Sequence, residues 1–166
     1  MYFCAKIINY ICIAEEGERD LITKYLPDCQ WPIIVTGVGA INVIQALSEV
    51  PREASLLNIG YAGSANFDIG TVVEVTEVRL NHPNVTYPEP KLELTPFDDG
   101  LWPIAQRKAV CYTNCDFVMQ SDYQDCVFDM ELAYIASLGF ASVSALKIVS
   151  DNLSLHAYHE VTNGVQ

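Results

Sequence analysis

The sequence predicts an α/β protein in which a mixed, mostly parallel sheet is flanked by helices, the arrangement adopted when strands and helices alternate along a chain. Short apolar runs alternate with segments of helical composition along most of the chain, and glycine-rich turns follow two of these runs. A chain of 166 residues with 51% hydrophobic and 18% charged residues is the size of one domain, so we expect a single domain over residues 1–166 with one well-formed core.

The first half of the chain is expected to begin with a buried strand at residues 7–13 and a helix at residues 15–25. A β-branched run at residues 32–35 then leads through a glycine turn into a helix at residues 40–47. The next strand, residues 55–59, ends at a second glycine turn, residues 60–63. In sheets of this kind ligands bind beyond the carboxyl ends of the strands, so these turns are candidate site segments.

The second half continues with a strand at residues 69–78, where β-branched residues alternate. The proline-rich stretch 81–102 is expected to be a loop or a covering excursion. Strands are expected at residues 108–112, 117–119 and 142–149, and a helix at residues 130–138. Asp129 stands before that helix, where it could cap the helix N-terminus.

Charge and composition exclude several classes of partner. A formal net charge of -12 with nine scattered Lys and Arg argues against nucleic acid, which requires a clustered basic surface. No apolar stretch is long enough for a transmembrane helix. Cys111 and Cys115 do not form a metal-ligand pair, so no metal is expected. The six cysteines follow no secretion signal, which predicts a cytoplasmic protein.

Four short motifs follow one another along the chain. They are Thr36-Gly37-Val38-Gly39, the segment Asn58 to Ser64, the segment Asp129 to Ala133, and Val149-Ser150-Asp151. Each has an ordinary structural explanation, such as a tight turn, a helix cap or a core aromatic. Together and in this order they resemble the purine nucleoside phosphorylase and nucleosidase superfamily, and most closely its methylthioadenosine/S-adenosylhomocysteine nucleosidases, over residues 7–151.

The resemblance implies a site for a purine nucleoside. Asp151 matches the acid that protonates the purine, and Glu131 matches the carboxylate that binds the ribose hydroxyls. Glu16 matches the carboxylate that activates the attacking water, although a shift of one or two residues would give that role to Glu15 or Glu18. The remaining binding residues implied by the resemblance are Met130 beneath the sugar, Phe117 stacked on the base, Val118 with its backbone, Asp129, and the segment Gly60, Tyr61, Ala62 and Gly63.

These assignments agree with the chemistry of glycosidic cleavage. Breaking the bond from C1′ to a base nitrogen builds positive charge on the sugar, which nearby carboxylates stabilise. A protonated carboxyl group is needed on the side of the leaving base. Three acidic residues at strand ends could divide these tasks without a cofactor.

Two departures from the superfamily favour water over phosphate as the nucleophile. Asn58 stands where the phosphorylases have an arginine, and an acidic run replaces their glycine-rich phosphate loop. The sequence therefore predicts a nucleosidase that hydrolyses an adenine nucleoside such as methylthioadenosine or S-adenosylhomocysteine. By resemblance, we also expect a homodimer.

Two alternatives stay open at this point. Tyr61 replaces a small residue and its bulk would fill part of the pocket, while the final helix after Asp151 is missing or reduced. Both features would suit a catalytically weak protein that binds nucleosides. The other alternative is a phosphorylase with an unusual phosphate site.

Overall fold

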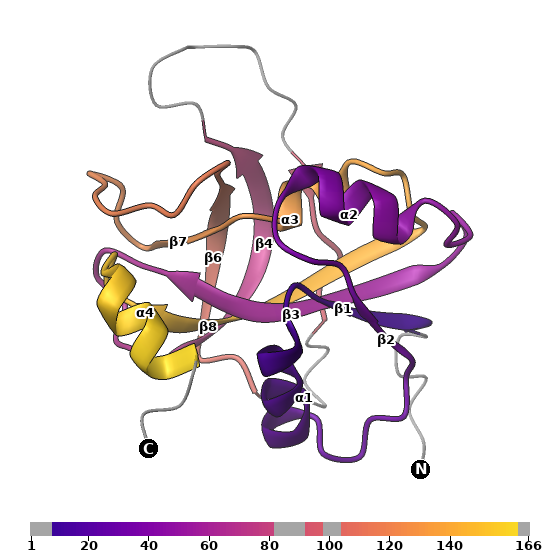
Figure 1. Cartoon of the computed structure of the whole chain (residues 1–166), viewed down its shortest axis with the longest axis horizontal. Helices are drawn as coiled ribbons and strands as arrows, with labels where there is room; N and C mark the ends of the chain where they lie inside the picture. The colour runs from indigo at the N-terminus through magenta and orange to yellow at the C-terminus, as the bar shows by residue number, and fades with distance from the viewer. Residues whose placement is uncertain (1–7, 82–91, 98–103, 163–166) are drawn as a thin grey trace.

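The computed structural model describes residues 8–81, 92–97 and 104–162 (Figure 1). These residues form strands, helices and one short 3-10 helix, η1, in an alternating order. The elements are β1 (Tyr10–Ile13), η1 (Glu16–Glu18), α1 (Arg19–Tyr25), β2 (Ile33–Val35), α2 (Ala40–Leu47), β3 (Ser55–Gly63), β4 (Val72–Leu80), β5 (Leu92–Glu93), β6 (Arg107–Thr113), β7 (Cys126–Asp129), α3 (Leu132–Ala136), β8 (Ser142–Asp151) and α4 (Leu155–Thr162).

The strands form one mixed sheet in the order β2-β1-β3-β7-β6-β4-β5, and β8 pairs with both β3 and β4. Five of the strand pairs are parallel, namely β1 with β2, β1 with β3, β3 with β8, β4 with β6, and β6 with β7. The expected α/β fold with a mixed, mostly parallel sheet is confirmed.

The sheet also closes on itself, which the sequence did not predict. Because β8 bridges β3 and β4, the strands β3, β8, β4, β6 and β7 form a barrel-like ring. Register shifts between Val75 and Glu77 in β4 and between Ala62 and Gly63 in β3 accompany the closure. Such irregularities bend a strand and increase its twist, which allows a sheet to curl.

Hydrophobic residues form two clusters on opposite sides of β3, with α2 and α3 on one side and α1 on the other (Figure 1). Successive side chains of a strand point to opposite faces. Leu56 and Ala62 therefore join the cluster near α2 and α3, whereas Leu57, Ile59 and Tyr61 face the cluster near α1.

Several predicted elements differ in the structure. The expected glycine turn at residues 60–63 is the end of strand β3, and residues 117–119 are a loop instead of a strand. Strand β7 was not predicted, because four residues offer too few alternations to be recognised. The expected helix at residues 15–25 is divided into η1 and α1.

Two expected features concern segments that the structure describes only in part. Most of the stretch 81–102 lies outside the described residues, but Leu92–Glu93 forms β5, and Leu94 and Phe97 are buried in the core. After Asp151 the chain forms α4, so a final helix is present. None of the helices in the described ranges has the length and apolarity that a membrane span requires.

Candidate active site

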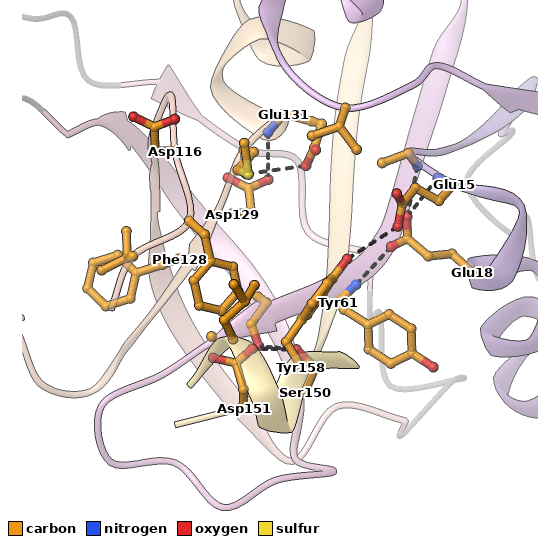
Figure 2. A pocket seen from close by; sticks show the side chains of 18 residues that line it. Glu15, Glu18, Tyr61, Asp116, Phe128, Asp129, Glu131, Ser150, Asp151 and Tyr158 are labelled. Carbon is orange, nitrogen blue, oxygen red and sulfur yellow. Dashed lines mark hydrogen bonds between the residues drawn. The ribbon is translucent and has the colours of Figure 1, made fainter. Parts of the chain in front are cut away.

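A cavity of about 270 Å³ opens at the carboxyl ends of β1, β3, β7 and β8, with α4 on one side (Figure 2). Most of the predicted site residues line it, namely Tyr61, Ala62, Gly63, Phe117, Val118, Asp129, Met130, Glu131 and Asp151. Gly60 and Glu16 do not line it. The structure therefore brings together residues that lie up to 90 positions apart in the chain, as expected for strand ends that meet at one edge of a sheet.

Asp151 is fully buried at the end of β8. Its Oδ2 accepts a hydrogen bond of 2.7 Å from the Ser150 hydroxyl, and its Oδ1 accepts one of 2.9 Å from the backbone N–H of Leu153. Burial nevertheless raises the pKa of the Asp151 carboxyl above its usual value. A raised pKa favours the protonated form, which a general acid needs.

Glu131 is also buried, just beyond the end of β7. Burial, and then the negative charge of Asp129, raise the pKa of Glu131 to about 8. Met130 lies between the two acids along the chain and lines the cavity with them. Two neighbouring carboxylates in a buried site cannot both ionise freely, and here the charge is concentrated on Asp129.

Asp129 is fixed by its surroundings. Its Oδ1 accepts a hydrogen bond of 2.6 Å from the Thr113 hydroxyl, and its Oδ2 accepts one of 2.8 Å from the backbone N–H of Leu132, at the start of α3. The side chain thus satisfies a backbone donor of α3, the structural role expected for it, while also lining the cavity.

Glu18, and not Glu16, is the buried acid of η1. Glu16 is exposed and pairs with Arg19, whereas Glu18 is only 7% exposed and lines the cavity. The predicted residue Glu16 therefore does not lie at the cavity, whereas Glu18, one of the two alternatives left open above, does. Residues three apart lie on one face of a helical turn, so η1 directs Glu15 and Glu18 toward the cavity and Glu16 toward solvent.

The Glu18 carboxylate is held by three backbone donors. Its Oε1 accepts from the N–H groups of Ala14 at 2.9 Å and Glu15 at 3.1 Å, and its Oε2 accepts from the Tyr61 N–H at 2.9 Å. Burial raises the pKa of Glu18, and the positive charge of Lys147 opposes that rise. A carboxylate fixed in this way is positioned to take a proton from a water molecule.

Lys147 is the cation of this acidic site, and the sequence analysis missed it. It lies on β8 with 2% of its surface exposed, and its Nζ is 3.0 Å from Asp129 Oδ2. Burial opposes its charge, but the negative charges of Asp129 and Glu131 raise the pKa of Lys147 above its usual value. The sequence did contain a signal for this ion pair. A lysine within an apolar run that predicts a buried strand needs an acidic partner in the folded protein.

Tyr61 does not obstruct the cavity with its ring, contrary to the expectation from its size. Its ring packs against the hydrophobic cluster beside α1, and its backbone N–H donates to Glu18 (Figure 2). The physical reason is the alternation of β3: a residue that follows Gly60 in an extended strand points to the opposite face.

Gly60 acts through close approach, since a Cβ at this position would overlap Glu18 Oε2. Gly60 packs against the Glu18 carboxylate and does not line the cavity. Its role is therefore to leave room for the Glu18 carboxylate.

Helix α4 completes the cavity through Tyr158 and Leu155. The Tyr158 hydroxyl donates to Glu15 Oε2 at 3.2 Å, and its ring centroid is 5.5 Å from that of Phe117. Burial, and then the charge of Glu15, raise the pKa of the Tyr158 hydroxyl. Neither Tyr158 nor Glu15 was assigned a binding role from the sequence.

The charge of the cavity wall bears on the choice of nucleophile. Among the described residues that line the cavity, none is Arg or Lys. Asn58 is buried, and its side-chain amide donates to the Cys12 carbonyl at 3.1 Å. The described wall therefore offers water a basic carboxylate but offers phosphate no cationic side chain. Among the described residues, no cluster of His, Cys, Asp and Glu is arranged to hold a metal ion.

Comparison with known proteins gives a structural likeness without a sequence match. No family model and no curated protein matches the chain. Among solved structures, the nucleosidase (MTAN) of Chlamydia trachomatis has a TM-score of 0.70 and 21% identity, over 94% of this chain and 91% of that one.

Two further neighbours were solved with transition-state-type inhibitors. The 5′-methylthioadenosine/S-adenosylhomocysteine nucleosidase from S. pneumoniae has a TM-score of 0.71 and 16% identity, over 93% of this chain and 91% of that one. The enzyme from Neisseria meningitidis has a TM-score of 0.69 and 16% identity, over 93% and 92%. This chain has the fold of the methylthioadenosine/S-adenosylhomocysteine nucleosidases.

Proposed function

We propose that this protein hydrolyses the N-glycosidic bond of an adenine nucleoside, the class that includes methylthioadenosine and S-adenosylhomocysteine. One observation carries the proposal: a cavity without a cationic side chain among its described lining residues holds buried Asp151, Glu131 and Glu18. A reaction that passes through a positively charged sugar needs acids of this kind around it.

The proposed reaction divides the work among these acids. Asp151 donates its proton to a ring nitrogen of the purine while the bond from C1′ to the base breaks and its electron pair leaves with the base. Glu131 binds the ribose hydroxyls. Glu18 accepts a proton from water as the water oxygen bonds to C1′. The positive charge of Lys147 stabilises the ionised carboxylates of Asp129 and Glu18.

The structural neighbours support the same reaction class. The neighbours above are nucleosidases, and the Chlamydia trachomatis protein has been solved with MTA and with adenine. Phe117 and Val118 line the same cavity as Asp151, which supports recognition of the base beside the proton donor.

The test is chromatography of adenine nucleosides incubated with the purified protein, with and without phosphate. We expect release of free adenine at a rate independent of phosphate. Asp151→Asn and Glu131→Gln should abolish release, and Glu16→Gln, at an exposed position outside the cavity, should not. Adenine release that survives both cavity substitutions would refute the proposal.

A weak nucleoside-binding protein was suggested by the bulk of Tyr61 and by a missing or reduced final helix. The Tyr61 ring packs beside α1, and the short helix α4 contributes Leu155 and Tyr158 to the cavity wall, which supports the enzyme over this alternative. A phosphorylase would show strict dependence on phosphate in the same experiment.

We further propose that the protein is a homodimer in the cytoplasm. Three apolar side chains are exposed on α2 and just before it, namely Val38, Ile41 and Ile44, and Val38 also lines the cavity. Such an exposed apolar surface supports burial against a second copy of the chain. The free thiols of the five described cysteines suit a reducing compartment. Light scattering of the purified protein tests the dimer, and a monomer at every concentration would exclude it. Cell fractionation tests the location, and recovery of the protein outside the cytoplasm would contradict it.

A further inference from the structure

We propose that the cavity selects a nucleoside that carries a hydroxyl group at C5′ over one that carries a thioether there, through Glu15 and Tyr158. This inference rests on the proposed function, because it names the substrate class of the same site. It concerns one part of the wall, which we call the polar clamp: the Glu15 carboxylate and the Tyr158 hydroxyl.

The polar clamp occupies the part of the wall that the proposed reaction leaves unused. Asp151 and Phe117 are assigned to the base, Glu131 to the ribose diol, and Glu18 to the water. Glu15, Val38, Leu155 and Tyr158 are lining residues without such an assignment. The ribose has one further substituent, at C5′, and the inference places that substituent against this wall.

The clamp is built across two distant segments of the chain. Tyr158 comes from α4 and Glu15 from the start of η1, 143 residues earlier, and their side chains meet at 3.2 Å (Figure 2). On its other side, the Tyr158 ring contacts Phe117 at 5.5 Å between ring centroids. The hydroxyl is thus fixed beside the cavity by contacts on two sides.

Helix α4 lies against β8 and has no buried residue. Its end approaches Gly17, where an added Cβ would lie 3.5 Å from the Thr162 carbonyl oxygen. The hydrogen bond from Tyr158 to Glu15 joins this helix to the start of η1.

Hydrogen-bond matching decides which substituent fits. A C5′ hydroxyl can donate its hydrogen to the Glu15 carboxylate or to the oxygen of the Tyr158 hydroxyl, whose own hydrogen is donated to Glu15. A methylthio group has no donor, and its sulfur is a weak acceptor. Binding it would place an apolar methyl group against a carboxylate and displace water that the ligand cannot replace.

The expected selectivity is moderate because Glu15 is exposed at the mouth of the cavity, where water competes for its oxygens. A hydrogen bond to a charged group contributes enough to change a ratio of kcat/KM values by about tenfold. We expect adenosine to exceed 5′-methylthioadenosine by that factor.

The experiment measures kcat/KM for adenosine and for 5′-methylthioadenosine. Two variants dismantle the clamp: Glu15→Met replaces the carboxylate with an apolar chain of similar length, and Tyr158→Phe removes the hydroxyl but keeps the ring against Phe117. Glu16→Met is the matched control, since Glu16 is adjacent and does not line the cavity. We expect the first two variants to lower the ratio toward or below one and the control to leave it unchanged.

Binding to the Asp151→Asn variant, measured by calorimetry with the same two nucleosides, separates this inference from the proposed function. Tighter binding of adenosine to this variant, together with no base release by the wild-type protein, would support the clamp and reject hydrolysis. A wild-type preference for 5′-methylthioadenosine, with base released, would overturn the clamp and leave hydrolysis standing. The clamp is also refuted if the ratio is unchanged in both variants, or if neither nucleoside binds.

Discussion

The cavity has two walls that differ in how their backbone is held. One, the strand wall, consists of Asp129, Met130, Glu131, Ser150 and Asp151, which lie at or just beyond the ends of β7 and β8. The other, the helical wall, consists of Glu15 and Glu18 around η1 and of Leu155 and Tyr158 on α4. β7 is buried at every position, whereas α4 has no buried residue.

The positions of the residues in the two walls are therefore fixed by different interactions. Residues of the strand wall are placed by backbone pairing within the ring, which strands on both sides enforce. Residues of the helical wall are placed by side-chain contacts, namely the bonds to Glu18 and the Tyr158 contacts. Substitutions in the first wall should therefore damage folding or chemistry strongly, and those in the second should change geometry and selectivity.

The largest expected effect concerns the buried ion pair between Lys147 and Asp129. Lys147→Met leaves buried Asp129 without its cation, so the free energy of unfolding should fall by about 3–5 kcal/mol. Urea denaturation measures it, and Lys24→Met at an exposed position is the control, with an expected loss below about 1 kcal/mol. Equal losses in the two variants would show that the Lys147–Asp129 pair is unimportant.

The next effect tests the strand wall directly. Asp151→Asn removes the proposed proton donor but keeps the shape of the side chain, so kcat should fall by about 10²–10⁴-fold with the fold intact. The decline of kcat/KM at high pH that reflects loss of the Asp151 proton should also disappear. Steady-state kinetics over a pH series measures both, and a variant with an unaltered pH profile would remove Asp151 from the mechanism.

A comparison within the helical wall distinguishes two neighbouring acids. Glu18→Gln should lower kcat by about 10²-fold because the amide cannot accept the proton of water. Glu16→Gln should leave kcat unchanged, since Glu16 only pairs with Arg19 at the surface. The opposite outcome would restore the assignment that the sequence suggested.

The close approach of β3 to the helical wall can be tested at Gly60. Gly60→Ala places a Cβ against Glu18 Oε2, and we expect a loss of about 1–3 kcal/mol in stability together with a lower kcat. Gly17→Ala is the matched control, because its Cβ would meet only the Thr162 carbonyl at an ordinary distance of 3.5 Å. Thermal unfolding and kinetics of both variants provide the measurement, and equal behaviour would contradict the close-approach role of Gly60.

The last expected effect is on the pH dependence of the free energy of unfolding. The pKa of Glu131 is raised from 4.5 to about 8, so between these values the folded state holds a proton that the unfolded state has released. The stabilisation linked to that proton is complete below pH 4.5 and is lost as pH rises toward 8. The free energy of unfolding of wild type should therefore decrease relative to Glu131→Gln across this range, and parallel curves in urea titrations would contradict the assignment.

The place of Asp151 could be predicted from the sequence because it depends on a local pattern: an apolar run identifies a strand, and the polar residue that ends it faces the ligand edge. Asp129 and Glu131 follow β7, which was not predicted, and Glu131 was assigned through the resemblance. The same reasoning failed for η1. A turn of three residues has no periodicity of its own, so the choice among Glu15, Glu16 and Glu18 required the contact with Tyr61.

Sequence alone therefore determined the α/β class, the mixed sheet and the place of Asp151 at the end of a strand, because these follow from the spacing of residues along the chain. The tertiary structure alone decided the closure of the ring through β8, the pairing of Lys147 with Asp129, the outward direction of the Tyr61 ring and the meeting of Tyr158 with Glu15. Each of these joins segments far apart in the chain, and such contacts are set by packing and charge in the folded molecule.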